Sequence, residues 1–266
     1  MRVKNYIRPR TVEEAYKIIS EDGRAILLGG GSFLRLSFKK IDTIVDLQDV
    51  KLDFIEEKED VVEIGAMVTL GELERSIVIK RLYDGYISKF VSVIWSVQLR
   101  NIATVGGTIF PKWGFSDFIT ALLALDVDVY FYKSGKMKLE DFLKSKIGKD
   151  ILLKISIKKE ERKASFQFMR NSFYDFSILN LSLSCKNGKD FRLAVGARPG
   201  VAMMAVKTME FLNSVTNPLE NLEKATEILS SEIEFGNDFR ASGEYRKHLA
   251  SVLFKRALKE VLNHES

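Results

Sequence analysis

Residues 28–32 (LGGGS) and residues 104–108 (TVGGT) are the two stretches of this sequence that decide its fold. The first follows a short apolar run over residues 25–28, and the second follows the segment 98–102 (QLRNI). Because glycine has no Cβ, its backbone adopts positive φ readily and its amides approach an anion closely. Two such loops would clamp one diphosphate, although each loop taken alone is also typical of a tight turn after a strand.

Neither loop matches a better-known nucleotide motif. Residues 29–31 do not have the G-x-G-x-x-G spacing of the Rossmann fingerprint, and no Gly-Lys-Ser/Thr sequence follows either loop. The sequence therefore disfavours both a Rossmann domain and a P-loop.

The composition indicates a soluble globular protein. The chain has 266 residues, of which 46% are hydrophobic and 29% charged, so it is long enough for two domains or three small lobes. Its start has no apolar segment of signal-peptide length and its apolar runs are too short to span a bilayer, so we expect a cytoplasmic protein with no membrane contact.

The net charge of +5 comes from lysines and arginines that are scattered along the chain. We therefore expect no nucleic-acid partner, and a mild positive field would suit an anionic dinucleotide or an acidic partner subunit.

Cysteine and histidine are too few for a metal site. The single cysteine, Cys185, cannot form an intramolecular disulfide or ligate an iron–sulfur cluster alone, and His248 and His264 do not have metal-ligand spacing. We expect Cys185 to be a small sheet or core residue and His248 to lie on a helix surface. No pairing of nucleophile with base or of two carboxylates is visible either.

Hydrophobic periodicity and capping patterns divide the chain into three segments. In the first, we expect a helix over 12–19, capped by Thr11 and Glu14, and strands over 25–28 and 43–47.

The second segment is expected to hold a strand, three helices, a hairpin and a closing strand. The first strand is expected over 61–64 and the last over 151–157. The helices are expected from 69 onward, over 87–97 and over 118–125, and the run 127–132, which turns near 134–135, is expected to be a strand or a hairpin.

The third segment predicts a three-stranded antiparallel sheet covered on one face by helices. Extended residues 166–170 precede strands over 177–186 and 190–198, which are joined by Asn187-Gly188, a preferred hairpin dipeptide. The expected helices are 206–212, 219–230 and 244–262.

Five segments in register carry a family resemblance. They are 6–15 (YIRPRTVEEA), 62–69 (VEIGAMVT), 98–107 (QLRNIATVGG), 191–199 (FRLAVGARP) and 238–246 (DFRASGEYR). In this order and spacing the chain resembles the FAD-binding subunit of the molybdenum hydroxylases, the group of xanthine dehydrogenase and carbon monoxide dehydrogenase. The resemblance covers nearly the whole chain, and several motifs in register are more specific than either glycine loop alone.

The resemblance implies an α+β fold: a two-lobed α/β FAD-binding domain, residues 1–160 with lobes of about 1–57 and 58–160, then a C-terminal domain, residues 161–266, with the three-stranded antiparallel sheet and its helices. It also implies an electron-transfer subunit. Electrons would arrive from a molybdopterin large subunit through an iron–sulfur small subunit, pass to FAD and leave to NAD or another acceptor. This fits the missing catalytic pairs, because a flavin supplies its own redox chemistry.

The same resemblance places FAD against named residues. They are Leu28, Gly29, Gly30, Gly31, Ser32, Phe33 and Leu34 of the first loop, Thr104, Gly106 and Gly107 of the second loop, and Ile94, Asp117 and Leu152. The amides of residues 29–32 and the Ser32 hydroxyl would hold the diphosphate, and Asp117 would accept a hydrogen bond from the polyol. From the residues alone, Asp117 is equally a helix-start carboxylate, and Ile94 and Leu152 are equally core residues.

The chain also departs from the family pattern near this site. Thr108 stands where the family commonly has asparagine, residues 111–116 (PKWGFS) replace a Ser-Pro before the aspartate, and Arg170 is the only cation in the stretch 166–170. Phe173 and Tyr174 are aromatic candidates for the flavin edge.

Two other functions stay open at this stage. One is a stand-alone FAD oxidase or reductase with its own substrate pocket. The other is a flavin-free assembly module in which the glycine loops are only turns.

Overall fold

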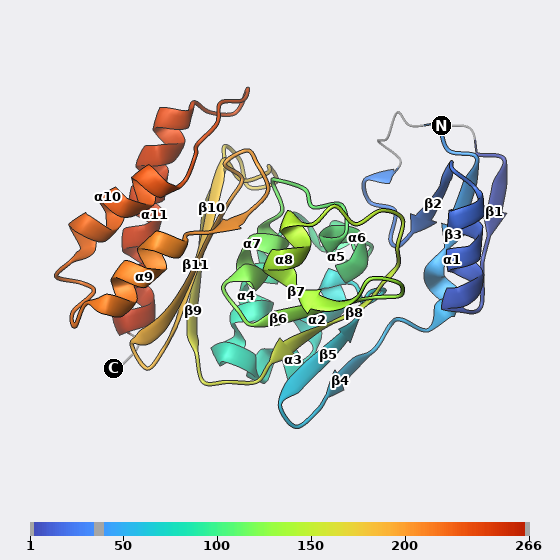
Figure 1. Ribbon diagram of the computed structural model, residues 1–266, viewed down its shortest axis with the longest axis horizontal. Helices are drawn as coiled ribbons and strands as arrows, with labels where there is room; N and C mark the ends of the chain where they lie inside the picture. Colours follow the sequence, from blue (N-terminus) through green and yellow to red (C-terminus); the bar gives the residue numbers. More distant parts are fainter. Residues whose placement is uncertain (1–2, 35–39, 264–266) are drawn as a thin grey trace.

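The computed structural model describes residues 3–34 and 40–263, which form three sheets that follow one another along the chain. Figure 1 shows the N-terminal sheet, the middle sheet and the C-terminal sheet side by side along the longest axis of the molecule. The mixed helix and strand architecture confirms the predicted α+β fold.

The N-terminal sheet is parallel and has the order β1–β3–β2, with β1 Asn5–Ile7, β2 Ala25–Leu28 and β3 Thr43–Asp46. Helix α1 (Val12–Glu21) buries Ala15 and Ile19 against this sheet. The hydroxyl of Thr11 accepts from the Glu14 amide at 3.2 Å, as predicted. The Glu14 carboxylate accepts from the amide of Arg10, so only half of the expected capping box forms.

The middle sheet is antiparallel, in the order β4–β5–β8–β6–β7. Its strands are β4 Ile55–Glu57, β5 Val61–Gly65, β6 Val127–Phe131, β7 Gly135–Lys138 and β8 Leu152–Lys158. Seven short helices accompany it: α2 Leu70–Arg75, α3 Ile77–Arg81, α4 Tyr86–Ser92, α5 Val97–Arg100, α6 Val105–Ile109, α7 Asp117–Leu123 and α8 Leu139–Lys144. Thr69 and Glu72 form a complete capping box at the start of α2.

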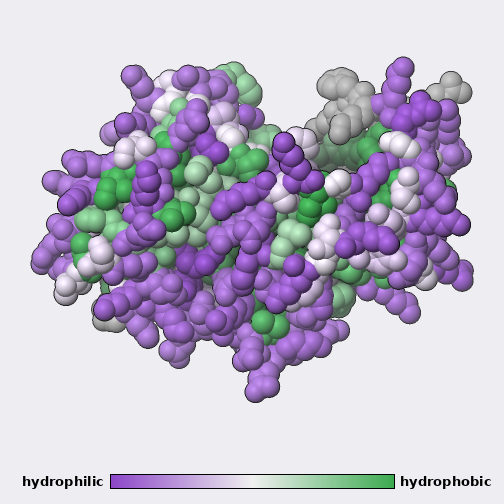
Figure 2. All heavy atoms as spheres, in the orientation of Figure 1, coloured by the Kyte–Doolittle hydropathy of each residue, from purple (hydrophilic) through white to green (hydrophobic). Residues whose placement is uncertain are grey.

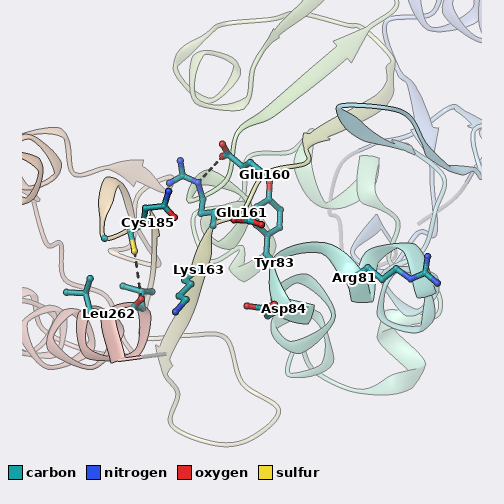
Figure 3. Close-up of a pocket in the computed structure, with 12 residues that line it drawn as sticks. Arg81, Tyr83, Asp84, Glu160, Glu161, Lys163, Cys185 and Leu262 are labelled. Atoms are coloured by element: carbon teal, nitrogen blue, oxygen red, sulfur yellow. Dashed lines mark hydrogen bonds and ion pairs between the residues drawn. The ribbon is translucent and has the colours of Figure 1, made fainter. Parts of the chain in front are cut away.

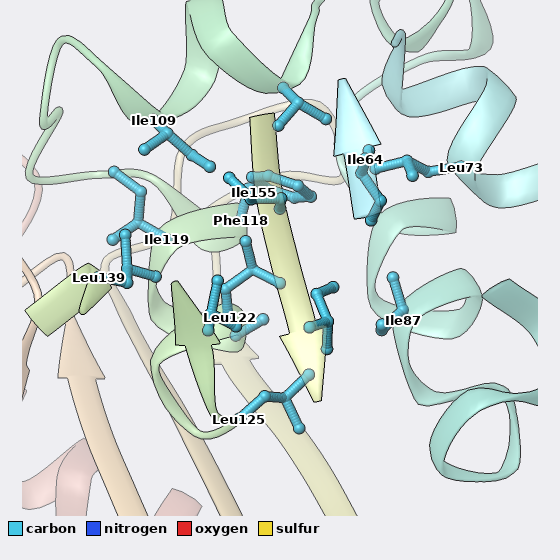
Figure 4. Packing of buried hydrophobic residues seen from close by; sticks show 14 of the residues in the cluster. Ile64, Leu73, Ile87, Ile109, Phe118, Ile119, Leu122, Leu125, Leu139 and Ile155 are labelled. Carbon is cyan, nitrogen blue, oxygen red and sulfur yellow. The ribbon is translucent and has the colours of Figure 1, made fainter. Parts of the chain in front are cut away.

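The largest apolar core lies between this sheet and its helices. Figure 4 shows Ile155 of β8 beside Phe118 of α7, with Ile109 and Leu122 close to them. These residues are fully or almost fully buried, which fixes the position of α7 and therefore of Asp117 at its first turn.

The helix predicted over residues 87–97 is instead two helices. Helix α4 ends at Ser92 and α5 begins at Val97, with Trp95 between them at φ 48°. The buried guanidinium of Arg100 accounts for the break, because it donates to the carbonyl oxygens of Ile94 at 3.0 Å and Trp95 at 3.4 Å. A helix that continued from α4 through α5 would use these two carbonyls to accept from the amides of residues 98 and 99.

The C-terminal sheet is antiparallel and consists of β9 Lys163–Met169, β10 Leu179–Lys186, β11 Lys189–Gly196 and β12 Met203–Met204. The three predicted strands are present, and β12 adds two residues at the edge. Asn187 and Gly188 have φ of 50° and 66°, as the predicted hairpin turn requires. Helices α9 Val206–Ser214, α10 Leu222–Glu232 and α11 Gly243–Asn263 cover one face (Figure 1).

The predicted positions of Cys185 and His248 are confirmed. Cys185 is buried in β10, and His248 is exposed on α11, whereas His264 lies outside the described residues. Within residues 3–34 and 40–263, no group of three metal-ligating side chains is found, and no helix is long and apolar enough to cross a bilayer. Figure 2 shows a largely hydrophilic face with hydrophobic residues gathered in patches.

Candidate cofactor site

The first glycine loop leaves β2, and its backbone amides have no acceptor among the residues that the structure describes. None of the amides of Gly29, Gly30, Gly31 and Ser32 donates a hydrogen bond to any residue in the described part of the chain. Gly31 has φ +71°, a conformation that side-chain-bearing residues rarely adopt. Consecutive free amides in a short turn form a concave donor set of the kind that binds phosphate oxygens.

Glycine at positions 29 and 30 is also needed for packing against the second loop. A Cβ at Gly30 would lie 1.1 Å from the carbonyl oxygen of Ile102, and a Cβ at Gly29 would lie 2.5 Å from the hydroxyl of Thr104. The N-terminal and middle parts of the protein therefore touch backbone to backbone at this point, where Figure 1 places α5 and α6 on the side facing the N-terminal sheet.

The second loop, in contrast, uses its amides internally. The amide of Val105 donates to Val68, the amide of Gly106 donates to Ala66, and the amide of Gly107 donates to the Thr104 hydroxyl at 3.1 Å. Thr104 is thus the N-cap of α6. The donor set that fits an FAD diphosphate is therefore that of the first loop, while the second loop supports it from the other side.

Asp117 starts α7 and joins the middle part to the C-terminal sheet. Its side chain is only 7% exposed and accepts three hydrogen bonds, from Arg170 at 2.6 Å, Ser177 at 2.6 Å and Asn180 at 2.5 Å. Arg170 also donates to the carbonyl of Val93 at 2.6 Å. The buried carboxylate thus links the start of α7 to Arg170, Ser177 and Asn180. It also lines a cavity between α7 and the first loop.

Five aromatic rings, which we call the aromatic cluster, meet between the two loops and the C-terminal sheet. They are Phe33, Trp95, Trp113, Phe115 and Phe176. The rings of Phe115 and Phe176 have centroids 4.1 Å apart, and those of Trp113 and Phe115 stack at 5.5 Å. They enclose a cavity of about 60 Å³ that also borders Ser32, Ile94, Gly107 and Asp117.

The structure brings some predicted site residues to this cavity and places others elsewhere. Ser32, Phe33, Ile94, Gly107 and Asp117 line it. The remaining first-loop residues, Leu28 to Gly31 and Leu34, and Thr104 and Gly106 do not line it. Leu152 is a buried core residue at the start of β8.

The predicted flavin-edge aromatics are also outside the cavity. Phe173 and Tyr174 are exposed and contact each other, with centroids 4.9 Å apart. Phe176, only two residues further along, enters the aromatic cluster instead. Sequence reasoning missed this ring and those of Trp95, Trp113 and Phe115. The available signal was the unusual stretch 111–116, which introduces two large aromatic residues between α6 and α7.

A larger cavity lies away from the glycine loops. It has about 500 Å³ and is lined by charged residues of mixed sign, including Arg81, Asp84 and Glu160. Figure 3 shows Cys185 at this cavity with its sulfur directed toward α11, and Tyr83 close to Glu160. Burial raises the pKa of the Cys185 thiol, so this group is a poor nucleophile. The mixed charges do not select an anionic cofactor.

Taken together, the fold and the first loop define a flavoprotein of two lobes followed by a C-terminal sheet. Residues 1–157 match the family model for the FAD binding domain in molybdopterin dehydrogenase, and residues 164–261 match that for the CO dehydrogenase flavoprotein C-terminal domain. The chain belongs to this family. It is an FAD-binding subunit of the xanthine dehydrogenase and CO dehydrogenase-like oxidoreductases, and its cofactor is FAD.

Several known proteins resemble the chain over almost its full length. An uncharacterized protein, YgfM of Escherichia coli, is 25% identical over 94% of this chain and 93% of its own. The glyceraldehyde dehydrogenase medium chain of Sulfolobus acidocaldarius is 24% identical over 97% and 98%. Among solved structures, carbon monoxide dehydrogenase from Hydrogenophaga pseudoflava superposes with a TM-score of 0.91 at 19% identity, covering 98% of both chains.

Proposed function

We propose that this chain is the electron-transfer subunit of a molybdenum hydroxylase-type complex. In this proposal an iron–sulfur small subunit delivers electrons from a molybdopterin large subunit, and NAD or another acceptor takes them away. Residues 1–160 form the FAD-binding part and residues 161–266 the C-terminal part. The observation that supports FAD binding is that the amides of residues 29–32 donate to no residue within 3–34 and 40–263. The partner subunits are proposed from relatives that are named as subunits.

The chain's own residues have three tasks in this function. The amides of the first loop bind the diphosphate, and the Ser32 hydroxyl adds one more donor. Gly30 packs against the backbone of Ile102, and Gly29 packs against the side chain of Thr104. These contacts keep the amides of the first loop in place. FAD, when bound, supplies the redox chemistry.

No residue needs to act as a nucleophile or as a base in this function. A chain without a catalytic nucleophile or base is consistent with relatives that are named as subunits. One of them is the nicotinate dehydrogenase FAD-subunit of Eubacterium barkeri, which is 28% identical over 53% of this chain.

A charge introduced beside the first loop tests the diphosphate position. We would compare Ser32→Asp with Ser32→Asn, because asparagine has nearly the same size as aspartate but carries no charge. The carboxylate that Ser32→Asp introduces would repel the diphosphate, so FAD binding should weaken at least about tenfold, or about 1.4 kcal/mol, relative to the asparagine variant. Equal affinities in the two variants, each with unchanged thermal unfolding, would place the diphosphate elsewhere.

The partner subunits need a separate measurement. The chain would be isolated under mild conditions from the cells that produce it, and the material analysed for flavin, iron and molybdenum. Co-purification of iron and molybdenum with FAD supports the complex. A pure chain that holds FAD and oxidises or reduces a small substrate alone would favour the stand-alone oxidoreductase. A pure chain without FAD would favour the flavin-free assembly module.

A further inference from the structure

Strand β9 is an open edge of the C-terminal sheet. It pairs with β10 on one side, and no other described strand lies beyond it in the order β12–β11–β10–β9. Its seven residues, Lys163–Met169, include two phenylalanines and a single charged side chain, that of Lys163. An exposed edge of this length and apolar character is a template for pairing with another chain.

The other edge strands of the three sheets are short, and two of them are charged. Strands β1, β2, β4, β7 and β12 have two to four residues each. Two of the three residues of β4 are glutamates, and two of the four residues of β7 are lysines. Short length and charge are the usual protections against pairing between sheet edges. Among the strands that the structure describes, β9 is the one long edge without them.

The contacts of β9 show which of its backbone groups point away from β10. The carbonyl oxygen of Ser165 accepts from the Ser182 hydroxyl at 3.3 Å, and that of Met169 accepts from the Ile178 amide at 2.7 Å. Because the direction of the backbone groups alternates along an antiparallel strand, every second residue faces outward instead. These residues are Ala164, Phe166 and Phe168. Their three amides and three carbonyls have no hydrogen-bond partner within residues 3–34 and 40–263.

The outward groups are complementary to those of a second copy of the same strand. When Phe166 lies opposite Phe166 of an antiparallel second copy, Ala164 of each copy lies opposite Phe168 of the other. Each of these three residue pairs then exchanges two backbone hydrogen bonds, so every outward amide meets an outward carbonyl. A two-fold axis between the two Phe166 residues relates the copies, which is the commonest symmetry of soluble oligomers.

The side chains on one face of β9 fit the same arrangement. Ala164, Phe166 and Phe168 line a cavity of about 240 Å³ together with Tyr86 and Phe90 of α4. A two-fold axis perpendicular to the sheet keeps these side chains on the same face in both copies. Phe168 of one copy therefore enters the space beside the small Ala164 of the other. Removing the half-buried phenylalanines from water favours this pairing.

The charges on the opposite face of β9 are complementary. Glu260 of α11 accepts there from Ser165 at 2.6 Å and from Gln167 at 2.8 Å. In the paired arrangement, Lys163 of one copy is the diagonal neighbour of Gln167 in the other, and so lies close to the Glu260 carboxylate of that copy. Lys163 itself lies opposite Met169, so no like charges face each other along the two strands.

We propose that β9 is the interface through which two copies of this chain form a dimer. The two β9 strands pair antiparallel through the outward groups of residues 164, 166 and 168, and the four-stranded C-terminal sheets of the two copies become one continuous sheet. This surface includes none of the residues assigned to FAD, so the proposal does not depend on the FAD site.

The molar mass of the full chain over a range of concentrations tests the proposal. Sedimentation equilibrium should give twice the chain mass at micromolar concentrations. Ala164→Pro removes an outward amide but no bond to β10, and the loss from both copies should raise the dissociation constant at least about tenfold. Ala164→Val is the matched control, because valine is similar in size to proline and retains the amide. A monomer at all concentrations, or equal dissociation constants for the two variants, would overturn the proposal.

A cysteine at the two-fold axis gives a geometric test that does not depend on proline. In Phe166→Cys the two substituted residues would have Cα atoms about 5.5 Å apart, which is within disulfide range. In Lys163→Cys they would be about 20 Å apart, because they lie six positions out of register. Mild oxidation should therefore cross-link Phe166→Cys and not Lys163→Cys, both in a Cys185→Ala background. Equal cross-linking of the two variants would overturn the proposed pairing.

Hydrogen exchange distinguishes a second copy from another occupant of the same edge. In the chain alone, the amides of Ala164, Phe166 and Phe168 should exchange slowly where the dimer forms and rapidly after dilution to the monomer. Rapid exchange in the chain alone at every concentration, with slow exchange in a complex with partner subunits, would assign this edge to a strand of a partner and overturn the proposal.

Discussion

Arg170 donates to Asp117 over 2.6 Å, and this pair ties the end of β9 to the start of α7. The two side chains are 4% and 7% exposed, so the ion pair is almost completely removed from water. Each partner has further hydrogen bonds, and the pair therefore connects the middle sheet's helices with the C-terminal sheet. Removing one charge from such a pair leaves the other charge buried without compensation.

Asp117→Ala is accordingly expected to lower the free energy of unfolding by about 3–5 kcal/mol, measured by urea denaturation. The double variant with Arg170→Met should recover a substantial part of this loss, because no charge is then left unpaired. If Asp117→Ala alone were as stable as the unaltered protein, the ion pair would have no structural role. The predicted contact of Asp117 with the FAD polyol is tested by a different measurement. The FAD affinity of Asp117→Ala should be lower than that of the unaltered protein at temperatures where the variant is folded.

Gly30→Ala should disrupt the contact between the two glycine loops. The added Cβ would meet the Ile102 carbonyl oxygen at 1.1 Å, so one backbone must move. We expect a lower melting temperature and loss of retained FAD together. Gly23→Ala is the matched control, because nothing lies within 4 Å of a Cβ there, and its stability should stay within about 0.5 kcal/mol. A Gly30→Ala variant with native stability would contradict the observed packing.

The sequence predicted the elements that local signals define and missed those that distant contacts define. The hairpin at Asn187 and Gly188 and the helix start at Thr11 follow from turn and capping chemistry within a few residues. The break before α5 did not, because the guanidinium of Arg100, which donates to the carbonyls of Ile94 and Trp95, is also held by the carboxylate of Glu74, 26 residues away in the chain.

The residues of the candidate site were likewise predicted only in part from the sequence. The glycine clusters predicted two loops around one diphosphate, but only the amides of the first loop lack an acceptor among the described residues, and the sequence does not distinguish the two loops. The aromatic cluster draws on four separate loops, among them those of Phe33 and Phe176, and single-sequence patterns do not show which loops will meet. Asp117 was recognised by resemblance, but its partners Arg170 and Asn180 come from the C-terminal sheet and carry no local signal.

Cys185 should be unreactive in the folded protein. The thiol is buried in β10 and burial raises its pKa, so little thiolate forms near neutral pH. A thiol reagent is expected to modify the native protein very slowly and to react with its single cysteine fully after denaturation. Rapid reaction of the native protein would show that β10 or α11 opens locally.

The same raised pKa gives a stability effect with a defined sign. Above about pH 8.5 the thiol ionises in the unfolded chain but stays protonated in the folded one. The unfolded state then binds fewer protons, so stability falls as the pH rises through this range. The difference in unfolding free energy between the unaltered protein and Cys185→Ala should therefore shrink toward alkaline pH. A constant difference would mean that the folded thiol titrates normally.

Asp238 is expected to govern part of the acid stability through Arg246, whose side chain is 1% exposed. The guanidinium of Arg246 donates to Asp238 at 2.6 Å and to the carbonyls of Ile178, Gly236 and Ala241. Burial opposes ionisation of Asp238, but the hydrogen bonds from Arg246 and from nearby amides outweigh it and lower the pKa of this carboxyl. The folded state thus favours the carboxylate.

The carboxylate of Asp238 stabilises the folded state at pH values above its pKa in the unfolded chain, which is about 3.9. This stabilisation is lost as the pH falls through the lower pKa that Asp238 has in the folded protein. Asp238→Asn should be less stable than the unaltered protein at neutral pH, and the gap should narrow progressively below about pH 4. Glu227→Gln, which removes a carboxyl on the exposed side of α10, serves as the control for the loss of one carboxyl. Urea denaturation of the three proteins from neutral to acid pH measures the effect. A gap that is independent of pH would show that the hydrogen bonds to Arg246 do not depend on the charge of Asp238.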